Sequence, residues 1–171
     1  IAPRVSQFEN EQLAFYQHDM RLPFRINYFD AVMNMFTSFG YFKTDRDHLL
    51  ALKNLQRGLK PGGLFLLDYF NSEWVRKHLV RTEAKIVDNI EFHIKKSIRG
   101  GYVFKTVEFV TGGRLFHFHE RVRLFTLDDF QSLFSAAGLE LRHTYGSYDL
   151  SVFDVNTSKR LILIAQKKSP T

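Results

Sequence analysis

Residues 45–68 read DRDHLLALKNLQRGLKPGGLFLLD, and this stretch decides the fold class. Its first part predicts a helix from Asp45, because apolar side chains recur at helical spacing at Leu49, Leu52, Leu55 and Leu59. The helix is expected to end at Lys60-Pro61-Gly62-Gly63, and Leu64–Leu67 then reads as a short buried strand. A helix followed by a tight turn and a buried strand indicates an α/β fold with a parallel sheet.

The sequence upstream of this stretch continues the same pattern. Residues 29–42 read FDAVMNMFTSFGYF, in which residues 30–34 suit a buried strand and the Thr, Ser and Gly residues that follow indicate a loop. Further upstream, Leu13–Gln17 reads as a strand that ends at residues 18–21, before the helix- and strand-breaking Leu22-Pro23. Ligands of parallel α/β sheets bind beyond the carboxyl ends of the strands, so three strand ends are expected to converge on one site.

Residues 84–125 follow a different pattern. They read as three alternating strands separated by Gly100-Gly101 and Gly112-Gly113, which predicts an antiparallel β insertion. The α/β pattern resumes with Thr126 as a helix N-cap and Gly138 as the helix stop, followed by two more strands. The predicted division is therefore a core in residues 1–83, an insertion in residues 84–125, and the end of the core in residues 126–171.

The composition is that of a globular, soluble domain. The 171 residues are 44% hydrophobic, and no apolar run approaches the roughly 20 residues that a membrane-spanning helix needs. No secretory leader pattern opens the chain, so we expect a cytoplasmic protein. The absence of cysteine excludes disulfides, thiolate nucleophiles and cysteine zinc sites. The net charge is +6, but the Lys and Arg residues are scattered along the chain and form no basic run. We therefore expect a small-molecule partner rather than a nucleic acid.

The ordered set of Asp19-Met20-Arg21, FDAVMNMFTSFGYF, the Lys60-Pro61-Gly62-Gly63 turn and the strand that ends at Asp68 resembles the class I methyltransferases that use S-adenosylmethionine. It is most similar to small-molecule methyltransferases with a β insertion after the fifth strand, including the tail ERVRLF at 120–125 and LDDF at 127–130. The resemblance implies a Rossmann-like sheet in the order 3-2-1-4-5-7-6. In this chain strands three to seven would be present, and strands one and two would be missing.

The two missing strands would carry the family's glycine-rich turn and the acidic residue that holds the cofactor ribose. Neighbouring strands lie about 4.8 Å apart, so their absence would leave strands three and four roughly 14 Å apart and unpaired. The chain also begins at Ile1, without an initiator Met, which we interpret as an interior start. Our hypothesis is that the missing segment lies upstream or in a partner.

The resemblance also implies site residues. The set expected to bind the cofactor is Asp19, Met20, Asn34, Met35 and Phe36. The set expected to contact the acceptor is Phe39, Tyr41, Tyr69, Asn71, Arg121 and Tyr148. Plainer readings stay open, because an Asp in a loop often caps a turn and a Phe is often a core residue. No general base is identified from the sequence.

Two neighbouring histidines invite a metal reading. His117 and His119 share one face of a predicted strand, but Arg121 and Arg123 continue that face and disfavour a cation, so no metal site is predicted. Glu120 points to the opposite face, where we expect an Arg from a neighbouring strand as its partner.

The predicted function is methyl transfer from S-adenosylmethionine to a small-molecule acceptor. The aromatic content also suits an ammonium acceptor through cation–π contact. The alternatives are a nucleic-acid methyltransferase, a non-catalytic binding or partner subunit and, behind these, a nicotinamide enzyme. The acceptor and the oligomeric state stay open.

Overall fold

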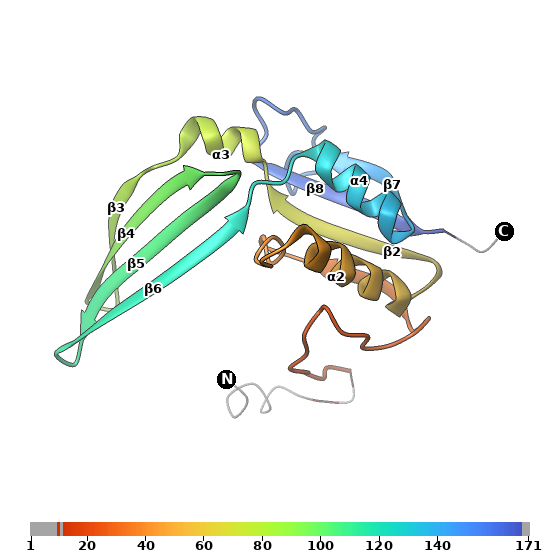
Figure 1. Cartoon of the computed structure of the whole chain (residues 1–171), viewed down its shortest axis with the longest axis horizontal. Helices are drawn as coiled ribbons and strands as arrows, with labels where there is room; N and C mark the ends of the chain where they lie inside the picture. The colour runs from red at the N-terminus through yellow and green to blue at the C-terminus, as the bar shows by residue number, and fades with distance from the viewer. Residues whose placement is uncertain (1–9, 11, 169–171) are drawn as a thin grey trace.

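The computed structural model describes residue 10 and residues 12–168, which form two four-stranded sheets. Figure 1 shows a core sheet covered by helices and a second sheet that extends away from it. We call them the core sheet (β1, β2, β7 and β8) and the lid sheet (β3 to β6). None of the helices in the described residues is long and apolar enough to cross a membrane.

The core sheet has the strand order β1-β2-β8-β7. Its strands are β1 (Phe29–Asn34), β2 (Leu59–Phe70), β8 (Arg160–Lys167) and β7 (Leu139–Tyr145). β1 runs parallel to β2, whereas β8 is antiparallel to both of its neighbours, β2 and β7. The four segments predicted as strands from residues 30, 64, 139 and 160 are thereby confirmed. In the described part of the chain β1 pairs with β2 alone, and Met33 on β1 is 69% exposed.

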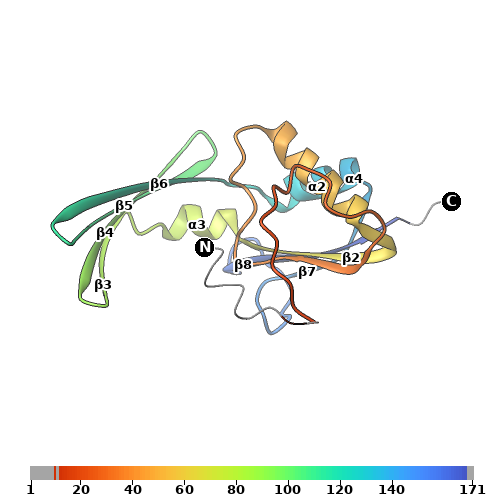
Figure 2. The same ribbon diagram turned by 90° about the horizontal axis from the view of Figure 1, so that it is seen from below.

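Helices α2 (Asp45–Gly58) and α4 (Leu127–Ala137) cover one face of the core sheet, as Figure 2 shows. Thr44 caps α2 by accepting a hydrogen bond from the backbone N–H of Asp47, and Thr126 forms a reciprocal capping box with Asp129. Gly138 ends α4 with a φ of 79°, a left-handed conformation that suits glycine. Both predicted helices are confirmed.

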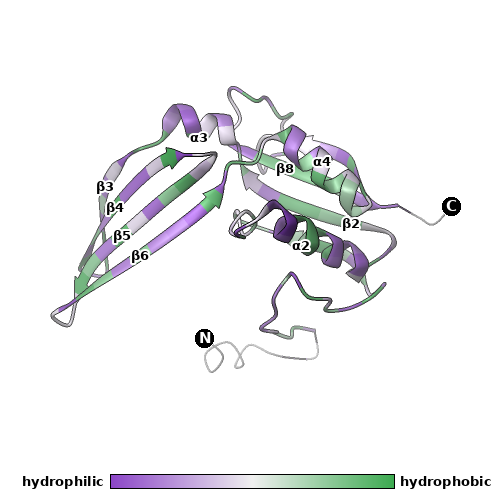
Figure 3. Ribbon diagram, viewed as in Figure 1, coloured by the Kyte–Doolittle hydropathy of each residue, from purple (hydrophilic) through white to green (hydrophobic). Residues whose placement is uncertain are grey.

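The core lies between these helices and the sheet. Aromatic and aliphatic side chains from α2, β2, α4, β8 and the loop after β1 are fully buried there, and Figure 3 shows the matching apolar character of β2 and β8. The largest of them are Tyr69, Phe39, Phe65, Phe130 and Phe134. This single cluster fixes the positions of the carboxyl ends of β1 and β2 relative to the helices.

The predicted strand at Leu13–Gln17 is wrong. Residues 14–19 have no regular secondary structure, and the nearest pairing is a single bridge between Asn10 and Leu13. A strand exists only where a neighbouring strand takes up its backbone hydrogen bonds, and the segment lies away from the sheet in Figure 1. Of this segment, Tyr16 lines a cleft that is described below. How the core strands correspond to the family's numbered strands stays a prediction, as does the absence of strands one and two.

The insertion has four strands, not the predicted three. They are β3 (Thr82–Val87), β4 (Ile90–Arg99), β5 (Tyr102–Thr111) and β6 (Arg114–Arg123), paired in sequential antiparallel order. The turn that the sequence reading missed is Asp88-Asn89, whose φ angles of 50° and 62° form a two-residue hairpin without glycine. A short helix, α3 (Ser72–His78), which was also not predicted, leads from β2 into the lid sheet.

Candidate functional site

Asp68, at the end of β2, is the centre of a buried polar network. Its carboxylate is fully buried and accepts hydrogen bonds from both Nε and Nη2 of Arg160, the first residue of β8. It also accepts from the backbone N–H of Phe36 and from the Tyr148 hydroxyl, each at 2.8 Å. One carboxylate therefore ties together β2, β8, the loop after β1 and the loop after β7.

The loop after β1 has a strained backbone that this network holds in place. Phe36 and Thr37 are consecutive non-glycine residues with φ of 58°, a conformation that costs L-residues roughly 1–2 kcal/mol each. Thr37 donates its N–H to the Asp68 carbonyl at 3.0 Å, and its hydroxyl accepts from Arg160 at 3.2 Å. The Phe36 ring is left 77% exposed at the carboxyl end of the sheet. Strained backbone that surrounding hydrogen bonds hold in place is typical of functional loops.

Asn34, the last residue of β1, has an unused hydrogen-bond acceptor. Its side chain is only 7% exposed, and its amide N–H points to the Met20 sulfur at 3.7 Å. Its Oδ1 is buried and has no partner among the residues that the structure describes. Buried polar atoms are nearly always satisfied, so this oxygen can accept a hydrogen bond from a bound water or ligand.

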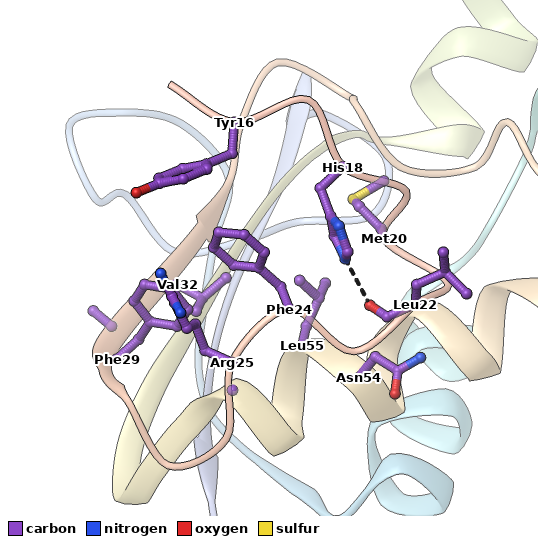
Figure 4. A pocket seen from close by; sticks show the side chains of 12 residues that line it. Tyr16, His18, Met20, Leu22, Phe24, Arg25, Phe29, Val32, Asn54 and Leu55 are labelled. Atoms are coloured by element: carbon purple, nitrogen blue, oxygen red, sulfur yellow. Dashed lines mark hydrogen bonds between the residues drawn. The ribbon is translucent and has the colours of Figure 1, made fainter. Parts of the chain in front are cut away.

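An apolar cleft of about 350 Å³ lies between β1, α2 and the N-terminal segment (Figure 4). Figure 4 shows Phe24 between Tyr16 and His18, with ring centroids 5.1 and 5.0 Å apart, and Met20 beside them. Asn54 of α2 holds this segment by donating to the Arg21 carbonyl at 2.7 Å. The cleft is lined by Tyr16, His18, Met20, Leu22, Phe24, Arg25, Phe29, Ala31, Val32, Asn54, Leu55 and Gly58.

Asp19 does not line this cleft. Its carboxylate accepts from the Arg21 guanidinium at 2.6 Å and from the Arg21 backbone N–H at 2.9 Å. The hydrogen bond from the Arg21 side chain lowers the pKa of Asp19 to about 2. These contacts are those of a turn-capping Asp, and a contact of Asp19 with a cofactor stays a prediction.

A second cavity of about 200 Å³ lies between the core and the lid sheet. The core side contributes the loop after β1 and the end of β2, and the lid contributes β4, β5 and β6. Its lining is Thr37, Tyr41, Phe70, Lys96, Val103, Lys105, Glu120 and Val122. The predicted acceptor residue Tyr41 therefore faces a cavity, next to Thr37 of the strained loop.

The other predicted acceptor residues have different environments. Phe39 and Tyr69 are fully buried, and the Tyr69 hydroxyl donates to the Arg123 carbonyl. Asn71 caps α3 and donates to the carbonyls of Val155 and Ser158, each at 2.8 Å. These three side chains support the strand ends from within the core, and their contact with an acceptor stays a prediction.

Arg121 lies on the lid face opposite the second cavity. Its guanidinium donates to the Phe42 carbonyl at 3.3 Å and lies 4.6 Å from the centroid of the Tyr102 ring. Tyr148, by contrast, belongs to the Asp68 network. Met35, predicted as a cofactor residue, accepts from the Ser38 hydroxyl through its carbonyl at 2.6 Å and so helps to close the loop after β1.

Sequence reasoning missed Arg160 and mispaired Glu120. A charged residue at the start of the apolar strand 160–165 was the available signal for Arg160, since a charge entering a buried strand needs a partner. Glu120 pairs with Lys105 at 3.3 Å, not with the predicted Arg, because the register of β5 and β6 places these two residues opposite each other. His117 pairs with Glu108 at 3.5 Å on the other face.

Known proteins similar to this chain are methyltransferases. A family model described as a methyltransferase domain matches residues 2–67. A dTDP-3-amino-3,4,6-trideoxy-alpha-D-glucopyranose N,N-dimethyltransferase from Streptomyces venezuelae is 29% identical over 140 residues, which are 77% of this chain and 59% of that protein. The chain thus spans less than two thirds of this relative.

Solved structures share the fold. An S-adenosylmethionine-dependent methyltransferase from Clostridium acetobutylicum ATCC 824 superposes with a TM-score of 0.77 at 15% identity, over 89% of this chain and 63% of that one. The sugar N-methyltransferase KedS8 from Streptoalloteichus sp ATCC 53650 gives a TM-score of 0.72 at 16% identity, over 98% and 69%. The matched domain, the related dimethyltransferase and these solved structures are all those of methyltransferases, and they support the resemblance seen in the sequence.

Proposed function

We propose that the protein containing this chain transfers a methyl group from S-adenosylmethionine to an amino group of a small, sugar-like acceptor. The observation that carries the proposal is the arrangement at the carboxyl ends of β1 and β2. There an unpaired buried acceptor on Asn34 and the strained loop held by Asp68 lie together. The printed activity of the related dimethyltransferase, which acts on an amino sugar, supports the choice of acceptor.

The described residues fit the cofactor at this strand end. Asn34 offers a buried oxygen for a ligand N–H, and the cleft beside Met20 has the apolar, aromatic lining that suits a ring system such as adenine. When bound, the cofactor supplies a sulfonium methyl group that its own charge already activates. The role of this chain's residues is then to bind, to align and to exclude water.

The acceptor side requires alignment more than proton chemistry. An amine that arrives unprotonated attacks directly, and a base is needed only for a protonated amine. The cavity between core and lid borders the strained loop through Thr37, so an acceptor held there lies beside the strand ends.

The test uses the full-length protein. Isothermal titration calorimetry with S-adenosylmethionine is expected to show one-site binding, and mass spectrometry is expected to show a methyl group added to an amino sugar and not to its hydroxyl analogue. Substitution of Asn34 by Leu, which removes the unpaired oxygen, is expected to weaken cofactor binding by about tenfold, the value of one good hydrogen bond. Binding without any transfer would favour the alternative of a non-catalytic partner subunit.

One observation keeps nucleic acid as a second candidate. The register of the lid strands gathers basic side chains that are scattered in the sequence onto one face, where Arg99, Arg121 and Arg123 flank Tyr102 and Phe104. Basic and aromatic side chains together suit a single-stranded nucleic acid. Filter binding of an RNA oligonucleotide at several salt concentrations tests this, since such binding weakens steeply with salt.

A further inference from the structure

We propose that Glu120 recognises the positively charged amino group of the acceptor in the cavity between core and lid, and that Lys105 is a counter-ion which this amino group replaces. The inference rests on the proposed function, methyl transfer to an amine, and it adds the residue that selects the substrate class. We call the cavity lined by Thr37, Tyr41, Phe70 and the lid residues the lid cavity.

The lid cavity lies where an acceptor has to bind. Thr37 lines it while its hydroxyl accepts from Arg160, so one residue links the cavity to the Asp68 network. Phe70, another lining residue, is the last residue of β2. A molecule in the lid cavity therefore lies beside the carboxyl ends of β1 and β2, where the proposed function places the cofactor.

The charges on the cavity wall favour a cation at Glu120. Lys96 lies 2.6 Å from Glu83, which neutralises this lysine. Lys105 lies 3.3 Å from Glu120, and the two side chains are 33% and 46% exposed. Partly exposed pairs of this kind are weak, so an incoming ammonium group can replace the lysine at small cost.

Glu120 also has unused acceptor capacity. An ionised carboxylate offers about four lone-pair sites, and in the described part of the chain Lys105 is its one hydrogen-bond donor. An ammonium group supplies the N–H donors that these sites need, and it loses one proton to solvent before its nitrogen lone pair attacks the methyl group. An anion would instead lie next to Glu120 and would have to displace carboxylates from both lysines.

Two aromatic side chains complete the binding environment. The Tyr41 and Phe70 rings line the same cavity and offer π faces to a cation. Burial, and secondarily the charge of Glu120, raises the pKa of Tyr41, so its hydroxyl stays protonated near that carboxylate. That hydroxyl makes no hydrogen bond to any residue in the described ranges and is free to donate to an acceptor hydroxyl. The cavity thus suits a molecule with one amino group and neighbouring hydroxyls.

The experiment measures binding of 3-amino-3-deoxyglucose and of glucose to the full-length protein by ligand-observed NMR titration. Wild type is expected to bind the amino sugar about tenfold or more tightly than glucose, a normal value for one charge-assisted contact. Glu120→Gln is expected to reduce this preference to about twofold or less, since it keeps the shape and removes the charge. Lys105→Met is expected to tighten amino-sugar binding by about threefold, because the competing cation is gone.

Glu108→Gln is the matched control. It makes the same chemical change on the opposite face of the lid sheet, where Glu108 pairs with His117, and is expected to keep the wild-type preference. Thermal melting of each variant shows whether the fold is retained.

The inference is overturned if wild type binds both sugars equally, if Glu120→Gln keeps the preference, or if Lys105→Met weakens amino-sugar binding. Calorimetry with S-adenosylmethionine on the same samples separates the two proposals. Normal cofactor binding without amino-sugar preference refutes the role of Glu120 alone, whereas absent cofactor binding by wild type refutes the proposed function.

Discussion

Removal of the Asp68 carboxylate is expected to destabilise the protein more than removal of any surface acid. In Asp68→Ala, Arg160 keeps its charge at a site where its side chain is only 24% exposed, and the N–H of Phe36 and the hydroxyl of Tyr148 lose their acceptor. Breaking a fully buried pair costs about 3–5 kcal/mol, and the partial exposure of Arg160 together with relaxation of the strained loop lowers this to about 3 kcal/mol. A domain of this size loses about 2–4 °C of melting temperature per kcal/mol, so we expect a decrease of about 6–12 °C.

Urea denaturation and thermal melting of the full-length protein measure this effect. Asp68→Asn keeps an oxygen for the Phe36 N–H while losing the charge, and it is expected to fall between wild type and Asp68→Ala. The control is Asp30→Ala, which removes an exposed carboxylate paired with Lys60 at 2.7 Å and is expected to change the melting temperature little. Equal melting temperatures for Asp68→Ala and Asp30→Ala would refute the central role of the network.

Three further substitutions test the strained loop, the packing at Gly40 and the Asp19–Arg21 ion pair. Phe36→Gly is expected to keep stability within about 1 kcal/mol of wild type, because relief of the φ of 58° offsets the added chain entropy, while calorimetry shows weaker cofactor binding. Gly40→Ala is expected to lower the free energy of unfolding by about 2 kcal/mol or more in urea denaturation, because a Cβ there would overlap the Tyr69 hydroxyl. The control Gly100→Ala places its Cβ in open space and is expected to cost only about 1 kcal/mol of backbone strain. NMR titration is expected to give Asp19 a pKa of about 2 in wild type and a higher pKa in Arg21→Ala, which keeps the backbone N–H donor and loses the guanidinium. Because the folded-state pKa is lowered, the stabilisation from this pair is present above about pH 4 and is lost as the pH falls toward 2. A titration of Asp19 unchanged by Arg21→Ala would contradict the last prediction.

The helices and central strands of the core were predictable because each carries a local signal. The leucine stripe of α2, the Thr126 cap and the apolar runs of β2 and β8 depend on residues a few positions apart. The prediction of a strand at Leu13–Gln17 was wrong because a local apolar pattern indicates only which side chains favour burial. Whether a neighbouring strand is present to accept the backbone hydrogen bonds is a property of the whole sheet.

The binding roles of the predicted site residues stay predictions, and the sequence indicated few of their contacts. Three strand ends were expected to converge, and two of them, those of β1 and β2, belong to strands in the structure. Met20 lines the apolar cleft and accepts from the Asn34 amide N–H, and Tyr41 lines the cavity beside the lid sheet. Asp68 and Arg160 are 92 positions apart, and only the antiparallel entry of β8 beside β2 brings them together. No spacing rule within a sequence connects residues so far apart.

By itself the sequence determined the mixed α/β character, the presence of helices α2 and α4 and the resemblance to the methyltransferases. These follow from periodicity, capping residues and turn chemistry, which act over a few residues. The tertiary structure alone decided that Asp68 holds the strained loop, that Asn34 keeps a buried oxygen unpaired, and that Lys105 faces Glu120 over a cavity. Strand order and register set these contacts, because a shift of one residue turns every side chain of a strand to its other face.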